Sequence, residues 1–370
     1  MIPVQRPSVG QEELEAVGEV FKTAWLGMGS VTKEFEDSVG KFLGAKNVVA
    51  VNTGTTALHL AFDAAGLGPG DEVIVPSLTY VATIQAITAT GARPVFCDVQ
   101  EDTLNLDPRD AEKRVTPKTK AIVPVHYRGM PCDMDEILAL AKERGLRVIE
   151  DAAHAFGSHY KGKRIGSFGD LTCFSFDPIK NITCGEGGAV VTHDAKTTEL
   201  LQRKRILGID KDTWSRYRNE RSWFYDVTTQ GYRCHMSNVN AAIGLVQLKK
   251  FKKMNDRKVE VAKRYDEAFS GLKRIKLLRT DYNGIAFFMY IVKVLEDREG
   301  LMGFLKEKGI GTGIHYIPSH VFTLYKQDGL ELPATEALYK QILTLPLFPD
   351  ISDEQAGQVI SAVREWDAKG

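Results

Sequence analysis

Short apolar runs alternate along this chain with longer segments whose apolar residues recur at helical spacing. Seven runs rich in β-branched residues predict strands at residues 48–52, 72–76, 94–98, 121–126, 147–151, 172–175 and 189–192. Between several of them, the helical spacing predicts helices at residues 57–65, 81–90 and 134–144. This order predicts an α/β domain in which a mostly parallel seven-stranded sheet lies between helices.

The alternation ends near residue 195, and the pattern of the second half is different. A long helical pattern covers residues 238–269, followed by an apolar strand-like run at 286–295 and a helical pattern at 299–308. A chain of 370 residues is long for one simple core. We therefore expect a large domain at residues 1–248 and a smaller α+β domain at residues 249–370, with the boundary inside a continuous helix.

Composition narrows the classes of function. Lys and Arg number 48, as do Asp and Glu, so the chain lacks the basic excess that is usual in nucleic-acid-binding proteins. The five cysteines are scattered and never spaced as CxxC, which argues against disulfides and structural zinc. No apolar run approaches the ~20 residues of a membrane span, and residues 1–14 lack the apolar region of a signal peptide. We expect a cytoplasmic protein.

Ligands of parallel α/β sheets bind beyond the carboxyl ends of the strands, and three motifs occupy such positions. The first is Gly54-Thr55-Thr56, between the strand at 48–52 and the next helix. A turn of this kind offers unpaired backbone N–H groups, two hydroxyls and the positive end of the helix dipole, which suits a phosphate. The alternative is that Thr55 serves only as the N-cap of the helix.

The second motif is Asp151-Ala152-Ala153-His154, at the exit of the strand at 147–151. An aspartate there could pair with a cationic ring nitrogen, and His154 could form a hydrogen bond with a phenolate. Alternatively, Asp151 caps the next segment and His154 is a core histidine with its hydrogen bonds satisfied. The residues themselves leave both interpretations open.

The third motif lies at residues 174–189, which read FSFDPIKNITCGEGGA. Lys180 lies in a short connection between two strands, and a glycine-rich turn follows it. A lysine in a partly desolvated site can lose its proton near neutral pH and form a Schiff base. Ser175 could contribute a further hydroxyl to a phosphate. Most lysines are surface charges, but this context is unusual for a surface lysine.

A glycine-containing run at residues 310–320 belongs to the expected small domain. Its glycine spacing is superficially that of a dinucleotide-binding loop, but the third glycine is misplaced and no βαβ unit surrounds it. His315, Tyr316 and His320 could face a polar ligand across the cleft between the domains. We expect no metal site, because no carboxylate or cysteine stands near them in the sequence.

Taken in this order, the motifs resemble those of fold-type I enzymes that use pyridoxal 5′-phosphate (PLP). More closely, the chain resembles the DegT/DnrJ/EryC1/StrS family of sugar aminotransferases, from Trp25-Leu26-Gly27 to the His-Tyr-x-Pro-x-His segment at 315–320. The most specific part is Ser-Phe-x-x-x-Lys-x-x-x-x-Gly-Glu-Gly-Gly at 175–188. The resemblance implies the fold-type I architecture and transfer of an amino group from L-glutamate to a nucleotide-linked keto-deoxy-sugar.

The resemblance also implies roles for individual residues. Lys180 would hold PLP covalently, and it would act as base and acid while the cofactor passes through its pyridoxamine phosphate form. Asp151 would keep the pyridine nitrogen protonated, His154 would lie near O3′, and Tyr80 would stack on the ring. The phosphate would be bound by residues of the first and third motifs: Gly54, Thr55, Thr56 and Ser175. The substrate would be met by residues of the glycine-rich turn and the small domain: Glu186, His315, Tyr316 and His320.

One segment departs from the family pattern. Members commonly read Gly-Tyr-Asn-x-Arg-Met, where this chain has Arg233 in place of the asparagine. The family forms homodimers with active sites at the interface, and a polar residue of the partner chain reaches the phosphate. Arg233 could do so through bidentate contacts, or Asn238 could take the role. Basic residues between 203 and 221 could contact a diphosphate, although a solvated basic face explains most of them: Arg203, Lys204, Arg205, Lys211, Arg216, Arg218 and Arg221.

Other functions are compatible with parts of this pattern. A cysteine desulfurase of the same fold would need a nucleophilic cysteine on a mobile loop, and no cysteine stands in an obvious loop of that kind. Dehydratases related to the family carry histidine at the position of Lys180, so the lysine favours transamination over dehydration. A regulatory protein that binds PLP or a sugar nucleotide without turnover is the alternative from another class. The sugar, its nucleotide and the carbon that receives the amino group stay open.

Overall fold

The computed structural model describes residues 1–210 and 225–369, so Lys211, Arg216, Arg218 and Arg221 lie outside the described part. Its centre is a seven-stranded sheet with the order β1-β9-β8-β5-β4-β2-β3. The strands are β1 (Asn47–Val51), β2 (Glu72–Pro76), β3 (Arg93–Cys97), β4 (Thr119–Ile122), β5 (Arg147–Asp151), β8 (Leu171–Ser175) and β9 (Gly188–Thr192). Only β9 runs against its neighbours, so the predicted mostly parallel seven-stranded sheet is confirmed.

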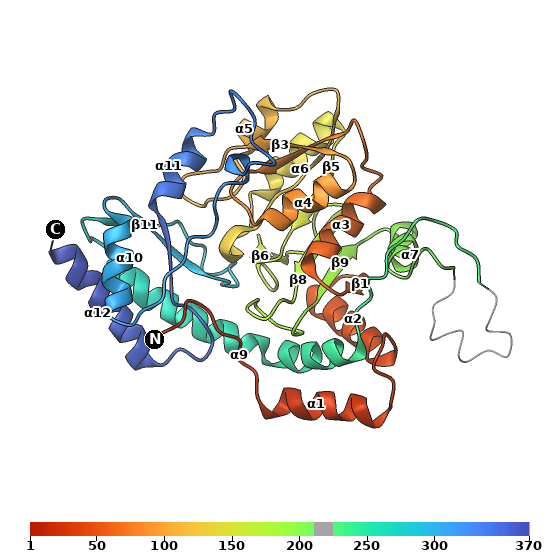
Figure 1. Cartoon of the computed structure of the whole chain (residues 1–370), viewed down its shortest axis with the longest axis horizontal. Coiled ribbons are helices and arrows are strands. Elements are labelled where there is room, and N and C mark those ends of the chain that lie inside the picture. Colours follow the sequence, from red (N-terminus) through yellow and green to blue (C-terminus); the bar gives the residue numbers. More distant parts are fainter. Residues whose placement is uncertain (211–224, 370) are drawn as a thin grey trace.

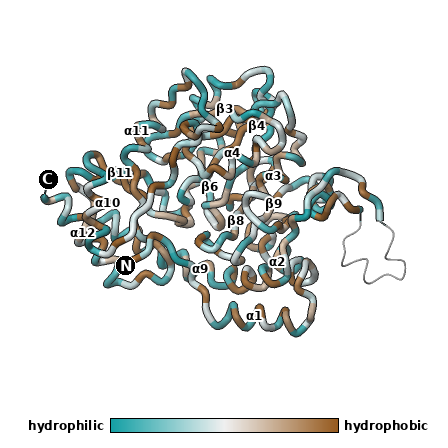
Figure 2. The backbone as a smooth tube through the Cα atoms, viewed as in Figure 1, coloured by the Kyte–Doolittle hydropathy of each residue, from teal (hydrophilic) through white to brown (hydrophobic). Residues whose placement is uncertain are grey.

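Helices cover both faces of this sheet (Figure 1). On one face lie α3 (Gly54–Ala64), α4 (Val81–Ala89) and α7 (Ala195–Lys204), which pack with alternate strand residues such as Val49 and Val51. The other face is covered by α2 (Ser30–Leu43), α5 (Pro108–Lys113), α6 (Met134–Arg144) and α9 (Asn238–Phe269). Because both faces are covered, the central strands are buried along their whole length and mostly apolar, which explains the largely apolar runs of the sequence (Figure 2).

The smaller part of the chain is built on a second sheet. Its antiparallel strands are β10 (Ile275–Leu277), β11 (Tyr290–Val294) and β12 (Ile342–Leu345), in that order. Three helices accompany them: α10 (Arg298–Glu307), α11 (Pro333–Gln341) and α12 (Asp353–Ala368). Ile2, at the other end of the sequence, forms a bridge with Ile310 and packs in the same core. The start of the chain therefore packs on its C-terminal part.

The long helix α9 runs along both parts of the molecule (Figure 1). Its 32 residues pack against α1 (Gln11–Lys22) and α2 near one end and against α12 nearer the other. Residue 249, the expected domain boundary, lies inside this helix and stays a prediction. No helix in the described part of the chain is long and apolar enough to cross a membrane. The remaining short elements are β6 (His159–Tyr160), β7 (Lys163–Arg164), η1 (Tyr127–Gly129) and η2 (Ser319–Val321).

Two strands are shorter than the apolar runs predicted. In the run at 121–126, regular strand pairing stops after Ile122, because Pro124 has no N–H to donate to a neighbouring strand. Beyond the proline, Val125 still forms an isolated bridge with Asp151. The run at 286–295 pairs only from Tyr290 onward. Before that residue, the carbonyls of Ala286 and Phe287 accept hydrogen bonds from side chains instead of from a strand.

Phe35 anchors α2 to the hairpin of β8 and β9. Its side chain is fully buried, and its ring meets that of Phe176 edge-on with centroids 5.3 Å apart. We expect Phe35→Ala to lower the free energy of unfolding by about 3–5 kcal/mol, because it leaves a large cavity. Urea titration followed by circular dichroism measures the change. Leu324→Ala, at a side chain that is 75% exposed, is the control and should change stability by less than about 0.5 kcal/mol. Equal effects of the two substitutions would contradict the packing described here.

Candidate active site

A cavity of about 390 Å³ lies where the carboxyl ends of β1, β5 and β8 face the segment at 315–316. This is the edge of the sheet where the sequence places its motifs. Most of the predicted site residues line it: Gly54, Thr55, Tyr80, Asp151, His154, Ser175, Lys180, Glu186, His315 and Tyr316. The fold therefore gathers residues from distant parts of the sequence into one cavity.

One end of the cavity is formed by the first turn of α3. The hydroxyl of Thr53 caps this helix by accepting a hydrogen bond from the backbone N–H of Thr56 at 3.1 Å. The first N–H groups of a helix have no acceptor within it, which leaves those of Gly54 and Thr55 for a ligand. A Cβ atom on Gly54 would stand 2.7 Å from that of Ser175, so only glycine fits between the helix and β8. The arrangement is a cradle for a small anion.

Asp151 lies at the end of β5 and is almost fully buried. One carboxylate oxygen accepts a hydrogen bond from the hydroxyl of Thr83 at 2.7 Å, and the other accepts one from the N–H of Ala153 at 3.1 Å. The hydroxyl of Thr83 is in turn 3.0 Å from that of Thr79. Both threonines line the cavity, and sequence reasoning did not single them out. The one feature of the sequence that could have identified them is their position close to Tyr80.

His154 has one ring nitrogen engaged and one unpaired. Its Nε2 is 3.1 Å from the hydroxyl of Tyr316, and its ring stacks on Phe288 with centroids 4.3 Å apart. Its buried Nδ1 has no hydrogen-bond partner among the described residues. Burial, together with the charge of Lys180, lowers the pKa of His154 well below its usual range. The imidazole is therefore neutral, with a nitrogen free to meet a ligand.

Lys180 lies in the connection between β8 and β9, where its backbone N–H donates to the carbonyl of Asp177 at 3.1 Å. Its Nζ stands 4.1 Å from the centre of the Phe288 ring. Burial lowers the pKa of this amine to about 8, although Asp177 and Asp151 oppose the shift. Far more of the amine is unprotonated near neutral pH than in an ordinary lysine, whose pKa is 10.5.

The mouth of the cavity combines aromatic rings with weakly basic and acidic groups. The rings of Tyr80 and Tyr316 lie 5.4 Å apart, and Tyr80 is 55% exposed. Burial lowers the pKa of His315 to about 4, and its Nδ1 is 2.8 Å from the hydroxyl of Thr344. Partial burial and the charge of Asp177 raise the pKa of Glu186. The entrance is thus suited to a polar ligand.

Four predicted residues do not line the cavity. The hydroxyl of Thr56 is 2.9 Å from that of Thr53. His320 is buried, with Nδ1 2.7 Å from the hydroxyl of Ser77. Asn238 begins α9, and its side-chain Oδ1 accepts a hydrogen bond from the backbone N–H of Thr32 at 3.0 Å. Arg233 is exposed.

The free amine at Lys180 gives a measurable pH dependence. In cofactor-free protein, we expect acylation of Lys180 by acetic anhydride to have a midpoint near pH 8, since burial disfavours the charged form. Mass spectrometry of the peptide that contains Lys180, over pH 6 to about 11, measures this midpoint. A midpoint at the ordinary lysine value of 10.5 would show that the amine is not desolvated.

Comparisons with known proteins agree with this geometry. The family model for the DegT/DnrJ/EryC1/StrS aminotransferase family matches residues 7–364. The chain is 43% identical over 375 residues to the spore coat polysaccharide biosynthesis protein SpsC of Bacillus subtilis, covering 98% of this chain and 96% of that protein. These matches cover nearly the whole sequence.

Solved structures are similar over the same length. The aminotransferase TlmJ of Streptoalloteichus hindustanus is 36% identical, with a TM-score of 0.94 over 100% of this chain and 99% of that one. Spr1654 of Streptococcus pneumoniae, in its pyridoxamine phosphate form, is 32% identical, with a TM-score of 0.94 over 100% of both chains. The chain belongs to the DegT/DnrJ/EryC1/StrS aminotransferase family and is a PLP-dependent sugar aminotransferase.

Proposed function

We propose that this enzyme transfers the amino group of L-glutamate to the keto group of a nucleotide-linked keto-deoxy-sugar. The observation that carries the proposal is the convergence of Lys180, Asp151 and the Gly54–Ser175 cradle on one cavity. The similarity to SpsC, a protein named for polysaccharide biosynthesis, supports a sugar that is activated for polymer assembly. The aromatic and polar entrance suits such a substrate.

The cavity fits PLP by its own chemistry. The cradle of Gly54, Thr55 and Ser175 would bind the phosphate, since it presents N–H groups and hydroxyls in a space that a Cβ would fill. Asp151, which has no cationic partner among the described residues, would face the pyridine nitrogen. The unpaired Nδ1 of His154 marks a buried position that needs a polar partner.

Each of these residues then has a distinct task. When bound, PLP supplies the electron sink that makes loss of a proton from carbon possible. Lys180 would hold the cofactor through Nζ and, once an amino donor replaced it there, its free amine would take and return the proton at the reacting carbons. Thr83 orients the carboxylate of Asp151 by donating to it. Tyr80 lines the cavity, where its ring would cover the cofactor and limit the access of water.

The proposal includes a homodimer in which each subunit completes the site of the other. Asn238 uses its side chain within its own chain, which makes it a poor candidate for reaching a partner. Arg233 is exposed and carries a guanidinium suited to a phosphate, so it is the better candidate for the contact across the interface. His320 would act indirectly, because its hydrogen bond to Ser77 would hold the loop of Tyr316 in place. A cytoplasmic location stays a prediction.

A lyase that uses a cysteine nucleophile is a weaker candidate. All five cysteine side chains are buried, and burial raises the pKa of each thiol. A nucleophilic cysteine needs a lowered pKa and access to the substrate. The cavity therefore favours an amino-group transfer that depends on Lys180.

We expect Lys180→Ala to abolish turnover, a fall of at least about 10²–10⁴-fold, because the amine positioned for the proton transfer is lost. The assay follows amination of a nucleotide-linked 4-keto-6-deoxyhexose with L-glutamate by mass spectrometry. Visible absorption before and after L-glutamate reports the first half-reaction separately. Lys33→Ala, at an exposed position on α2, is the matched control and should keep full activity. Full activity in Lys180→Ala would refute the assignment.

We expect Asp151→Asn to lower kcat by about 100-fold to 1,000-fold while the protein stays folded, because an amide no longer stabilises a protonated ring nitrogen. The amide keeps an oxygen that can accept from Thr83, so the melting temperature should change little. Steady-state kinetics and thermal unfolding monitored by circular dichroism measure the two effects. Equal kcat in the variant and the parent protein would exclude this role for Asp151.

A further inference from the structure

Lys258 is a buried lysine that the proposed reaction does not use. It lies within α9 with only 4% of its surface exposed, and burial lowers its pKa to about 7. Its Nζ donates hydrogen bonds to Oδ1 of Asn181 at 3.0 Å and to the backbone carbonyl of Phe287. Within the described residues no carboxylate pairs with it, so these two acceptors offset much of the cost of burying the amine.

Asn181 is the residue after Lys180, and its side chain ties that loop to its surroundings. Its amide nitrogen donates to the carbonyls of Phe156 and Ala286, at 3.1 Å each, and to that of His154 at 3.4 Å. Since the nitrogen faces these carbonyls, the amide oxygen must point the other way, where Lys258 is its donor. The loop of Lys180 is therefore fixed to α9 and to the segment before β11 through one side chain.

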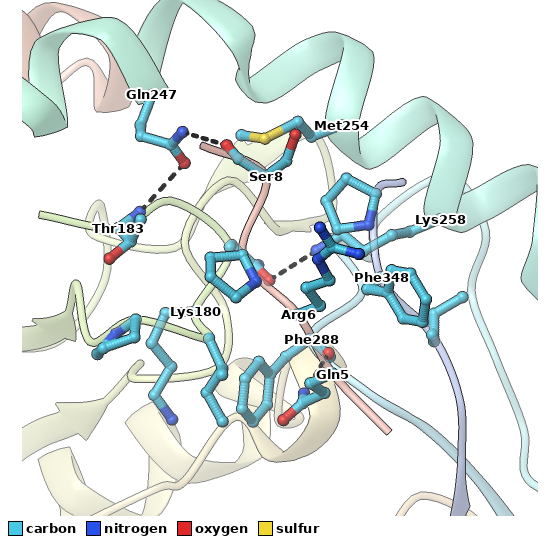
Figure 3. Close-up of a pocket in the computed structure, with 16 residues that line it drawn as sticks. Gln5, Arg6, Ser8, Lys180, Thr183, Gln247, Met254, Lys258, Phe288 and Phe348 are labelled. Atoms are coloured by element: carbon cyan, nitrogen blue, oxygen red, sulfur yellow. Dashed lines mark hydrogen bonds between the residues drawn. The ribbon is translucent and has the colours of Figure 1, made fainter. Parts of the chain in front are cut away.

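The second acceptor leads to the same place in the cavity. Phe287 precedes Phe288, whose ring stands 4.1 Å from Nζ of Lys180 and stacks on His154. Figure 3 shows Lys258 reaching from α9 toward the backbone behind Lys180, while the Lys180 side chain extends away from it beside Phe288. Lys258 thus binds Asn181, the neighbour of Lys180, and Phe287, the neighbour of Phe288.

We propose that Lys258 is a positioning residue: through Asn181 and the carbonyl of Phe287 it fixes the Lys180 amine against the Phe288 ring. The inference rests on the proposed role of Lys180. Because α9 packs in the cores of both parts of the chain, the same contacts connect the loop of Lys180 to the part that contributes His315 and Tyr316 to the cavity. Without them, the loop of Lys180 would loosen and water would reach the amine.

The pKa of Lys180 reports this loosening. The titratable groups around the amine are Asp177 of its own loop and Asp151 at the end of β5, with His154 and His315 across the cavity. None of these changes when Lys258 is replaced, whereas entry of water would raise the pKa toward its ordinary value. Loss of the positive charge of Lys258 would also raise the pKa of Lys180. A second substitution is therefore needed to separate the effect of charge from the effect of water.

The test compares Lys258→Met, Asn181→Leu and the double variant in cofactor-free protein. Acylation of Lys180 by acetic anhydride is followed against pH by mass spectrometry. We expect each single substitution to raise the midpoint by about one unit, a part of the ~3–5 units that full burial can impose. The double variant should rise no further than the larger single change, because both remove the same hydrogen bond. Lys252→Met, the same change at an exposed position on α9, should leave the midpoint unchanged.

Two results would overturn the proposal. One is a midpoint that does not move in Lys258→Met. The other is a shift in Lys258→Met with none in Asn181→Leu, because the effect would then come from charge alone. Additive shifts in the double variant would also overturn it, because the two residues would then act independently. If Lys258→Met does not fold, Lys258→Gln replaces it: one amide donor remains, so a smaller rise is expected and an unchanged midpoint counts against the proposal. No cofactor is present, so these outcomes are independent of whether Lys180→Ala retains turnover.

Discussion

Burial of the sheet on both faces is the constraint on which the rest of the structure depends. Strands such as β8 and β9 are buried along their whole length and mostly apolar because helices cover them from either side. Polar side chains inside the sheet are paired with each other, as Thr172 is with Glu150, and the polar groups that face a cavity lie where strands end. Asp151 and Ser175 are the last residues of their strands, which is why residues far apart in the sequence share one cavity.

The same constraint shapes the electrostatics of the site. An amine and a carboxylate at the edge of a covered sheet are largely withdrawn from water, and the structure compensates the two in different ways. Asp151 receives a hydroxyl and a backbone N–H, which satisfy the charged form. Lys180 receives an aromatic ring and little else, so its charged form is disfavoured. The pair combines a carboxylate held by two hydrogen bonds with an amine that readily loses its proton.

The sequence predicts the parts of this site that are local in the chain. Runs of β-branched residues locate the strands. Gly54, Asp151 and Lys180 belong to motifs that come at or just after the ends of these runs, so the sequence alone points to them. Contacts between distant segments leave no such signal. Thr83 is 68 residues from Asp151, and Lys258 is 77 residues from Asn181, so neither hydrogen bond can be inferred from spacing. The end of a regular strand can also differ from the end of an apolar run: β4 stops at Ile122, although the run continues, because Pro124 lacks the N–H that regular pairing requires.

The hairpin of β8 and β9 has a consequence for how far the reactive lysine can travel. Ser175 and Gly188 face each other in the ladder, so the loop that carries Lys180 leaves and re-enters the sheet at a single rung. At Gly188, a Cβ would stand 2.3 Å from the carbonyl oxygen of Thr53, so the backbone before α3 closes directly on that rung. The lysine is thus tethered at both ends to the floor of the cavity. The reach of its amine is therefore set by the side chain's length from a fixed backbone.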